Sequence, residues 1–372
     1  MGRPRKPRVA VVFGGRSGEH SVSCATAGSV LAAIDRERYD VVPVGISSDG
    51  RWVLEADDAE RLAITDGKLP SVDPSGSAVA LTSDPSSREL VVNEPGEVPR
   101  TLGEVDVVFP LLHGPWGEDG TIQGLLEMAG VRYVGAGVLA SAVGMDKHYM
   151  KIVLAAHGLP MGPYVALTPR AWTADRSGAL ASVEQLGYPV FVKPARGGSS
   201  LGIRRVERAG DLVDAVEEAR RHDPKVVVER AVDGARELEC GVLEGLDGQP
   251  AQASVVAEIS VDQTYAFYDF EAKYLDEDNV RLDVPADLPD AVAQEIRRLA
   301  VRAFDAIGCE GLARVDFFWS RARGVLINEI NTMPGFTTRS MFPRMWAASG
   351  LDYPALVDRL LQLALRRDTG LR

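Results

Sequence analysis

Residues 312–340 read LARVDFFWSRARGVLINEINTMPGFTTRS and carry the most informative pattern of the chain. Two runs rich in β-branched and aromatic residues flank a short Arg-Gly segment, which is typical of a β-hairpin. A two-residue turn at residues 322–323 fixes which residues of the two strands lie opposite each other. Because side chains alternate along a strand, this register puts two polar pairs on one face: Asp316 with Glu329, and Arg314 with Asn331.

The two acidic residues of this face indicate a metal site. Directly opposed residues hold their Cβ atoms ~4.5–5.5 Å apart, and two carboxylates at that separation repel each other unless a cation lies between them. Mg²⁺ suits the position because it prefers a few hard oxygen ligands together with substrate phosphates. Asn331 adds a neutral oxygen, and Arg314 adds a positive charge. The alternative is a solvated surface face, but LARVDFF and VLINEI are too apolar for one.

The residues after the second strand indicate an anion. Met333–Phe336 (MPGF) predicts a rigid turn that leads into a helix, and the N-terminus of a helix attracts anions. A metal-binding face that runs into an anion site is typical of phosphate chemistry.

Length and composition fit a globular enzyme. The chain has 372 residues, with 45% apolar and 25% charged residues, enough for two or three packed domains. The net charge of −12 argues against a nucleic-acid partner, which usually requires a basic face. No apolar run approaches the ~20 residues of a membrane span, and the run at residues 9–13 is too short for a signal peptide. The scattered cysteines have no metal-binding spacing. We therefore expect a cytoplasmic protein without a membrane partner.

The N-terminal segment predicts a Rossmann-like α/β domain. A strand over residues 8–13 leads through a glycine-rich turn (14–20) into a helix over 21–34 and a strand over 41–46, the β-α-β opening of such domains. The turn lacks a complete GxGxxG, and no acidic residue clearly ends the second strand, which disfavours an NAD-dependent oxidoreductase. Residues 57–104 predict turns and short strands, a surface elaboration without chemistry.

Two polar residues follow strands of this domain. Glu19 lies at the carboxyl end of the first strand, and His113 follows a strand over residues 105–112. Ligands bind at the carboxyl ends of parallel strands, so the two side chains predict a shared substrate crevice. A helix-capping carboxylate and a structural histidine are the alternatives.

The middle of the chain carries a second phosphate signal. A strand over residues 188–194 runs into the glycine-rich loop 195–202 and then a strand over 203–206, unlike the strand-loop-helix order of a P-loop. Flexible glycines with hydroxyls can close over phosphates, and Lys193 supplies a point charge beside them. Lys147, near the start of a helix, also indicates an anion, with a solvated lysine as the alternative.

Later segments suggest a nucleotide and a binding loop. The strand over residues 225–229 ends in an apolar segment that can offer backbone groups to an adenine edge, and Glu237 can bond a ribose. Residues 262–283 are long, aromatic and charged, as in a structured binding loop, with Lys273-Tyr274 at its reactive tip. Two amphipathic helices are predicted, at residues 289–307 and 351–365.

Seven motifs in order resemble those of the ATP-grasp superfamily and, more closely, of the D-alanine–D-alanine ligase family. The likeness covers nearly the whole chain, and seven ordered motifs are a very specific signal. They are GGRSGEHSVS (14–23), LLHGPWGEDGTIQG (111–124), GMDKHYMK (144–151), FVKPARGGSSLGI (191–203), YDFEAKY (268–274), ARVDFF (313–318) and NEINTMPGFTTRS (328–340).

The resemblance implies an ATP-grasp fold of the α/β class. It divides the chain into a Rossmann-like substrate domain (1–141), a central subdomain with the glycine-rich loop (142–235) and a C-terminal subdomain with the mobile loop and the metal site (236–372). The two α+β subdomains would clasp ATP. The resemblance also implies a homodimer, D-alanine and ATP as small-molecule partners, and two Mg²⁺ ions, with Mn²⁺ as a possible substitute.

The resemblance assigns roles to individual residues. Those implied for ATP are Lys147 and Lys193 at the phosphates, Ser199 and Ser200 in the loop that closes over them, Glu229 and the backbone of Ala231 and Val232 at adenine, Glu237 at the ribose, and Lys273 on the mobile loop. Those implied for metal are Asp316, Glu329 and Asn331, in agreement with the hairpin argument. Those implied for substrates and catalysis are Glu19 at the first D-alanine's ammonium with His113 close by, Arg314 and the Gly335 amide at the oxyanion, Ser340 and the Met341 amide at the second D-alanine's carboxylate, and Tyr274 linked to Ser199 and Glu19.

The implied reaction has two steps. ATP phosphorylates the carboxylate of one D-alanine, and the neutral amine of the second then displaces phosphate to give D-alanyl-D-alanine, a peptidoglycan precursor. In related depsipeptide ligases the loop tyrosine is replaced and D-lactate becomes the acceptor, so Tyr274 favours the dipeptide. A non-catalytic nucleotide-binding scaffold is a further alternative, disfavoured by the full set of site residues. Met333, where many relatives carry a smaller residue, and segment 57–104 are expected to lie away from the chemistry.

Overall fold

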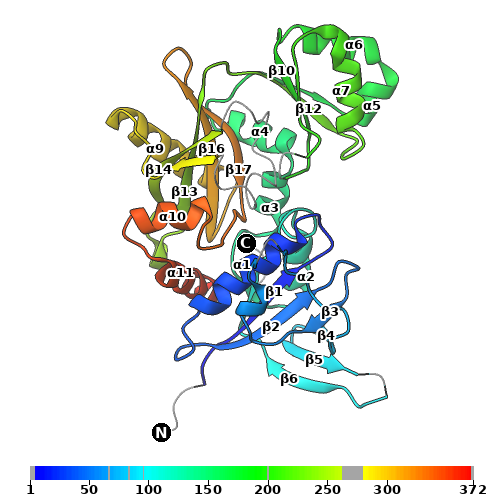
Figure 1. Cartoon of the computed structure of the whole chain (residues 1–372), viewed down its shortest axis with the longest axis vertical. Helices are drawn as coiled ribbons and strands as arrows, with labels where there is room; N and C mark the ends of the chain where they lie inside the picture. The colour runs from blue at the N-terminus through cyan, green and yellow to red at the C-terminus, as the bar shows by residue number, and fades with distance from the viewer. Residues whose placement is uncertain are drawn as a thin grey trace.

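The computed structural model describes residues 5–65, 68–82, 84–94, 96–198, 201–261 and 280–369. Four residues with predicted roles, Ser199, Ser200, Lys273 and Tyr274, lie outside the described residues, so those roles stay predictions. The described residues form three sheets. In Figure 1 the N-terminal sheet lies at the bottom, the central sheet at the upper right and the C-terminal sheet at the upper left.

The N-terminal sheet runs in the order β6-β5-β4-β3-β2-β1-β7-β8. Its strands are β1 (Arg8–Gly14), β2 (Asp40–Ile46), β3 (Trp52–Leu54), β4 (Ala78–Leu81), β5 (Glu89–Asn93), β6 (Arg100–Glu104), β7 (Val107–Pro110) and β8 (Arg132–Tyr133). The pairs β1–β2, β1–β7 and β7–β8 are parallel, which confirms the Rossmann-like prediction. The short strands predicted within 57–104 are also present, because β4, β5 and β6 continue the sheet in antiparallel pairs.

Helices from both ends of the chain cover the N-terminal sheet. They are α1 (His20–Ala33), the 3-10 turn η1 (Glu60–Leu62), α2 (Thr121–Met128) and α11 (Tyr353–Arg366). The C-terminal helix α11 lies beside α1 in Figure 1, and its Leu356 and Leu360 share one hydrophobic core with Val9 and Phe13 of β1. The end of the chain therefore packs on the domain that begins it.

The central sheet is antiparallel, in the order β11-β10-β12-β9. Its elements are α3 (Val138–Met145), α4 (Lys147–Ala156), β9 (Tyr164–Leu167), α5 (Pro169–Ala174), α6 (Arg176–Glu184), β10 (Val190–Pro194), β11 (Arg204–Val206), the 3-10 turn η2 (Ala209–Asp211), α7 (Leu212–Ala219) and β12 (Val226–Arg230). A core built around Val190, Val216 and Val228 joins this sheet to its helices. The strand, loop and strand order predicted around residues 188–206 is confirmed, since β10 pairs with β11.

The C-terminal sheet runs in the order β15-β14-β13-β16-β17. Its elements are β13 (Arg236–Leu243), the 3-10 turn η3 (Leu246–Gly248), β14 (Gln252–Val261), β15 (Val280–Asp283), α9 (Asp290–Ala306), β16 (Leu312–Ser320), β17 (Gly324–Asn331) and α10 (Met341–Ala348). Helix α9 packs in one core with Val315 and Ile327 of the hairpin, whereas Met341 and Met345 of α10 pack with Ala257 and Ile259 of β14.

The hairpin of β16 and β17 forms as predicted, but its turn is one residue longer. Ser320 pairs with Gly324, so residues 321–323 make a three-residue loop instead of the predicted two-residue turn. A β-bulge then shifts the register between Asp316 and Phe317. The two offsets cancel, and Asp316 lies opposite Glu329 as the sequence predicted.

Candidate active site

A cavity of about 630 Å³ lies between the N-terminal sheet and the C-terminal sheet. It is lined by residues that are far apart in the sequence. Those with predicted roles are Glu19, His113, Arg314, Glu329, Asn331, Gly335, Ser340 and Met341. The polar residues that follow two N-terminal strands therefore share one cavity with the polar face of the hairpin.

The polar face of the hairpin is tightly ion-paired. Arg314 donates to both oxygens of Asp316 at 2.7 Å, and its Nε lies 3.2 Å from Glu239 Oε1. Although burial disfavours the charge, Asp316 and Glu239 raise the pKa of the Arg314 guanidinium. Lys147 lowers the pKa of Glu329 to about 2, against the effect of burial. Arg314 and Glu329 therefore stay charged across the physiological range.

The donor set of this face suits a hard divalent cation. Asp316 and Glu329 lie opposite each other on adjacent strands. Asn331 lies two residues after Glu329 on the same strand, and its amide oxygen accepts from the Met333 N–H at 3.0 Å. Carboxylates and amide oxygens are the ligands that Mg²⁺ and Mn²⁺ take. Within the described part of the chain, however, no three His, Cys, Asp or Glu side chains converge as a metal-binding group. Arg314 contacts Asp316, and Lys147 contacts Glu329.

Lys147 joins the polar face of the hairpin to the glycine-rich loop. It is the first residue of α4, and Asp146 caps this helix by accepting from the N–H groups of His148 and Tyr149. The Lys147 ammonium lies 3.2 Å from Glu329 Oε2 and donates to the Gly197 carbonyl at 3.0 Å. The lysine that the sequence placed near an anion is therefore buried beside a carboxylate rather than solvated.

A second lysine, Lys193, lies in a buried polar cluster. Glu229 on β12 lies between two ammonium groups, 3.1 Å from Lys193 and 3.2 Å from Lys151. Burial alone would raise the pKa of Glu229, but the two lysines lower it to about 2. Glu229 is thus a charged carboxylate that joins β12 to Lys193 of β10 and Lys151 of α4.

The Glu19 side of the cavity is held by the loop after β7. Ser17 Oγ donates to the His113 carbonyl at 2.6 Å and accepts from the Glu19 N–H at 3.2 Å. Gly114 has φ +75°, and a Cβ there would lie 2.7 Å from Glu19 Oε2. A Cβ at Gly198 would lie 3.3 Å from the same oxygen. The Glu19 carboxylate therefore meets two close backbone segments, one of them from the glycine-rich loop.

The opposite end of the cavity contains the start of α10. The predicted turn at residues 333–336 does not lead straight into this helix, because α10 begins at Met341 after Ser340 as its N-cap. Ser340 Oγ accepts from the Thr337 N–H at 3.1 Å and lies 2.8 Å from Thr337 Oγ1. A hydroxyl and a helix N-terminus in one cavity wall form a favourable position for a carboxylate.

Models of the D-ala D-ala ligase N-terminus and C-terminus match residues 8–136 and 153–362. The chain belongs to the D-alanine–D-alanine ligase family. It is 61% identical to the D-alanine–D-alanine ligase of Kineococcus radiotolerans, with both chains covered in full. It is 60% identical to that of Streptomyces coelicolor, covering 98% of this chain and 95% of the relative.

Solved structures of the family share the fold of this ligase. The D-alanine–D-alanine ligase from Coxiella burnetii is 33% identical with a TM-score of 0.79, covering 97% of this chain and 94% of that one. The VanG D-Ala:D-Ser ligase from Enterococcus faecalis is 32% identical with a TM-score of 0.82, covering 97% and 100%. The chain is thus an ATP-dependent ligase with the ATP-grasp fold that acts on small molecules. Among its described helices, none is long and apolar enough to cross a membrane.

Of the residues predicted to meet adenine, Glu229 lies on β12 of the ligase, and Ala231 and Val232 directly follow that strand. The Ala231 N–H donates to the Pro189 carbonyl at 3.0 Å, and the Val232 carbonyl accepts from the Ala235 N–H at 3.2 Å. The Ala231 carbonyl and the Val232 N–H belong to one trans peptide unit and therefore point in opposite directions. Glu237 lies at the exposed start of β13. Although burial disfavours the charged ammonium of Lys193, Glu229, Glu329 and, more weakly, Glu237 raise its pKa.

Three charged residues of the site were missed from the sequence. Glu239 joins the acidic face because β13 pairs with β16 and puts it opposite Asp316. Glu118 is buried beside His113, with 3.6 Å between Glu118 Oε1 and His113 Nδ1; burial disfavours the charged imidazole, but Glu118 and Glu19 raise its pKa. Lys151 lies four residues after Lys147 on the same helix, so the two side chains share one helix face. This spacing could have indicated Lys151 from the sequence.

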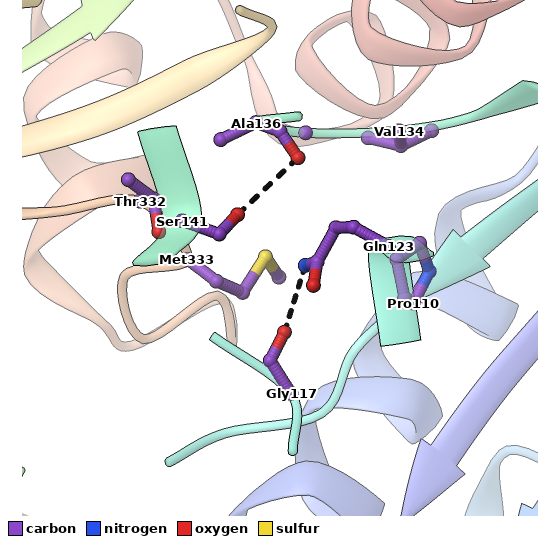
Figure 2. Close-up of a pocket in the computed structure, with 9 residues that line it drawn as sticks. Pro110, Gly117, Gln123, Val134, Ala136, Ser141, Thr332 and Met333 are labelled. Atoms are coloured by element: carbon purple, nitrogen blue, oxygen red, sulfur yellow. Dashed lines mark hydrogen bonds between the residues drawn. The ribbon is translucent and has the colours of Figure 1, made fainter. Parts of the chain in front are cut away.

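Met333 borders the chemistry of the ligase, contrary to the expectation from sequence. It lines the main cavity together with Glu19 and His113. Figure 2 shows its side chain also bordering a small cavity of about 10 Å³, beside Gln123. There Gln123 donates to the Gly117 carbonyl at 2.8 Å, which ties α2 to the loop that carries His113. Met333 therefore lies between the main cavity and the contact of Gln123 with Gly117.

Proposed function

We propose that this ligase uses ATP to join two molecules of D-alanine into D-alanyl-D-alanine, through a D-alanyl phosphate intermediate, for peptidoglycan precursor synthesis. The observation that carries the proposal is the single cavity in which Glu19 and His113 share walls with Arg314, Glu329 and the start of α10. An ammonium site, a phosphoryl-transfer site and a carboxylate site lie within reach of one another there. Since ATP is the co-substrate, the reaction takes place in the cytoplasm.

The first D-alanine binds with its ammonium at Glu19 and its carboxylate toward Arg314. The carboxylate oxygen attacks the γ-phosphorus of ATP, the bond to the ADP oxygen breaks, and the acyl phosphate forms. Lys147 and Lys193 hold the phosphates, and Ser199 and Ser200 belong to the loop that closes over them. Mg²⁺, or Mn²⁺ in its place, would be held as two ions by Asp316, Glu329 and Asn331, and would supply neutralisation of the phosphoryl charge.

The second D-alanine binds with its carboxylate at Ser340 and the Met341 amide. Its neutral amine attacks the acyl carbonyl, and the Arg314 guanidinium and the Gly335 amide stabilise the oxyanion. The tetrahedral species then expels inorganic phosphate to give the dipeptide. Glu229, Ala231, Val232, Glu237 and Lys273 complete the ATP site, and Tyr274 would link Ser199 to Glu19.

The domains proposed for this reaction are residues 1–141, 142–235 and 236–372. We also propose a homodimer, supported by an exposed apolar surface on α2 and α3, which lie against each other. This surface, the α2–α3 patch, consists of Leu125, Met128, Val138 and Leu139. A contiguous exposed apolar surface is typical of a protein interface.

A ligase with another acceptor is the second candidate. It is favoured by the likeness to the VanG D-Ala:D-Ser ligase, whereas Tyr274 favours D-alanine over a hydroxy acid such as D-lactate. The test measures ADP release with Mg-ATP and D-alanine alone, with D-serine added, and with D-lactate added, and identifies each product by mass. Dipeptide from D-alanine alone, lost in Asp316→Ala, supports the main proposal. Turnover that depends on added D-serine or D-lactate overturns the proposed specificity for D-alanine as acceptor. Nucleotide binding without ADP release leaves only the non-catalytic nucleotide-binding scaffold.

A further inference from the structure

The β-bulge of the hairpin gives one residue an unusual position. On β17, Ile327 pairs with Phe317 and Glu329 pairs with Asp316, so Asn328 is the extra residue between them. A bulge disrupts the ladder locally and re-aims side chains, and bulges are over-represented next to active sites. Asn328 directly precedes Glu329, which contacts Lys147.

The side-chain amide oxygen and the backbone carbonyl of Asn328 both accept hydrogen bonds from lysines of the central region. Its side-chain Oδ1 accepts from Lys193 Nζ at 3.3 Å, and its backbone carbonyl accepts from Lys151 Nζ at 3.2 Å. Lys193 lies on β10 and Lys151 on α4, and both also contact Glu229 on β12. Asn328 of the C-terminal sheet and Glu229 of the central sheet thus contact the same two ammonium groups.

The geometry limits what Lys193 can do without Asn328. Glu229 uses one carboxylate oxygen for each lysine, and by itself it fixes Lys193 at a single point. The Asn328 amide adds a second fixed acceptor, so the ammonium is held between two points. A lysine side chain has four rotatable bonds and loses rotamer freedom when it binds a phosphate. Holding it beforehand reduces that loss when the ligand binds.

We propose that Asn328 is a positioning residue for nucleotide binding, which orients Lys193 from the strand that carries the metal-binding carboxylates. The proposal rests on the phosphate role given to Lys193 under the proposed function. Through the bulge, two consecutive residues of β17 hold three lysines: Asn328 holds Lys193 and Lys151, and Glu329 holds Lys147.

The test is a double-mutant cycle on ADP affinity, measured by isothermal titration calorimetry at fixed MgCl₂. Asn328→Leu keeps the side-chain size and removes the acceptor. We expect it to weaken ADP binding by about three- to tenfold, as for loss of one hydrogen bond in a bound complex. We expect Lys193→Met to weaken ADP binding at least as strongly. In the Lys193→Met background, Asn328→Leu should change ADP affinity less than about twofold, because residues that act through one another do not add.

The outcomes separate this inference from the proposed function. Unchanged ADP affinity in Lys193→Met removes the phosphate role of Lys193. The positioning role is overturned if Lys193→Met weakens ADP binding but Asn328→Leu changes ADP affinity equally in both backgrounds. It is also overturned if Asn328→Leu changes ADP affinity in neither background. Asn328→Ala repeats the cycle if the leucine variant fails to fold, which thermal unfolding reports. Arg323→Leu, in the exposed loop of the same hairpin, is the matched control and should leave ADP affinity unchanged.

Discussion

The Lys147 ammonium lies 3.2 Å from Glu329 Oε2, so a lysine proposed to hold phosphate contacts a carboxylate proposed to hold metal. Lys193 lies 3.1 Å from Glu229, a carboxylate proposed to meet adenine, and Arg314, proposed to stabilise the oxyanion, lies 2.7 Å from Asp316, another carboxylate proposed to hold metal. The cations and anions of the site thus neutralise one another. We propose that binding of a metal nucleotide exchanges partners at the first of these pairs, with Lys147 moving to phosphate and Glu329 to metal.

The exchange predicts that removing Lys147 separates metal affinity from nucleotide affinity. In Lys147→Met the Glu329 carboxylate loses its partner, and a divalent cation no longer competes with an ammonium. We expect Mn²⁺ to bind the nucleotide-free variant about tenfold more tightly, since a hydrogen bond to a charged group is worth ~1.5–3 kcal/mol and ~1.4 kcal/mol is a factor of ten. ADP binding should weaken. Electron paramagnetic resonance of free Mn²⁺ measures the first effect, and calorimetry the second.

A loss of Mn²⁺ affinity in Lys147→Met would contradict this exchange, because it would mean that Lys147 supports the metal site. The control is Lys147→Met combined with Glu329→Gln, in which the gain in Mn²⁺ affinity should disappear.

Part of this site was predictable from the sequence because strand periodicity is local. Alternation puts Arg314 and Asp316 on one face of the first strand and Glu329 and Asn331 on one face of the second, and the length of the turn decides whether these two faces coincide. The three-residue loop and the bulge at Asn328 were not predictable, because each is a one-residue offset and only the pairing of the complete strands reveals it. Glu239 was missed for a related reason, since its place opposite Asp316 depends on a pairing between segments more than 70 residues apart.

Stability should fall in acid because of Glu229. Its pKa lies at about 2, below the ordinary 4.5, so the unfolded chain binds the proton more readily than the folded chain. The stabilisation is therefore complete above about pH 4.5 and is lost as the pH falls toward 2. Urea unfolding from pH 7 to pH 2.5 should show this decline in the free energy of unfolding.

Glu229→Gln should lower the free energy of unfolding at pH 7 by about 3–5 kcal/mol, because it leaves Lys151 and Lys193 buried without their carboxylate. The acid decline should also become shallower in this variant. An acid profile of unchanged slope would assign the decline to other carboxylates. Glu184→Gln, at the last residue of α6, is a control that should alter neither stability nor slope.

Gly114→Ala should impair binding of the first D-alanine. The added Cβ would lie 2.7 Å from Glu19 Oε2, and φ is +75°, a conformation that costs an L-residue ~1–2 kcal/mol. Displacement of the Glu19 carboxylate should raise the KM for D-alanine about tenfold or more, with a smaller effect on the KM for ATP. Gly162→Ala is the matched control, since a Cβ there meets nothing within 4 Å. Equal effects on both KM values would point to a general disturbance of the loop instead.

The α2–α3 patch predicts the oligomeric state. Met128 and Leu139 are 73% and 71% exposed, which is unfavourable for two large apolar side chains on adjoining helices unless another surface covers them. Analytical ultracentrifugation should show a dimer for the unaltered chain and a monomer for Met128→Asp combined with Leu139→Asp, because a desolvated carboxylate in an apolar interface is costly. Val98→Asp is the control: Val98 is 88% exposed but lies outside the patch, so this variant should remain dimeric. A dimer that survives the double substitution would place the interface elsewhere, and a monomeric unaltered chain would remove the proposal.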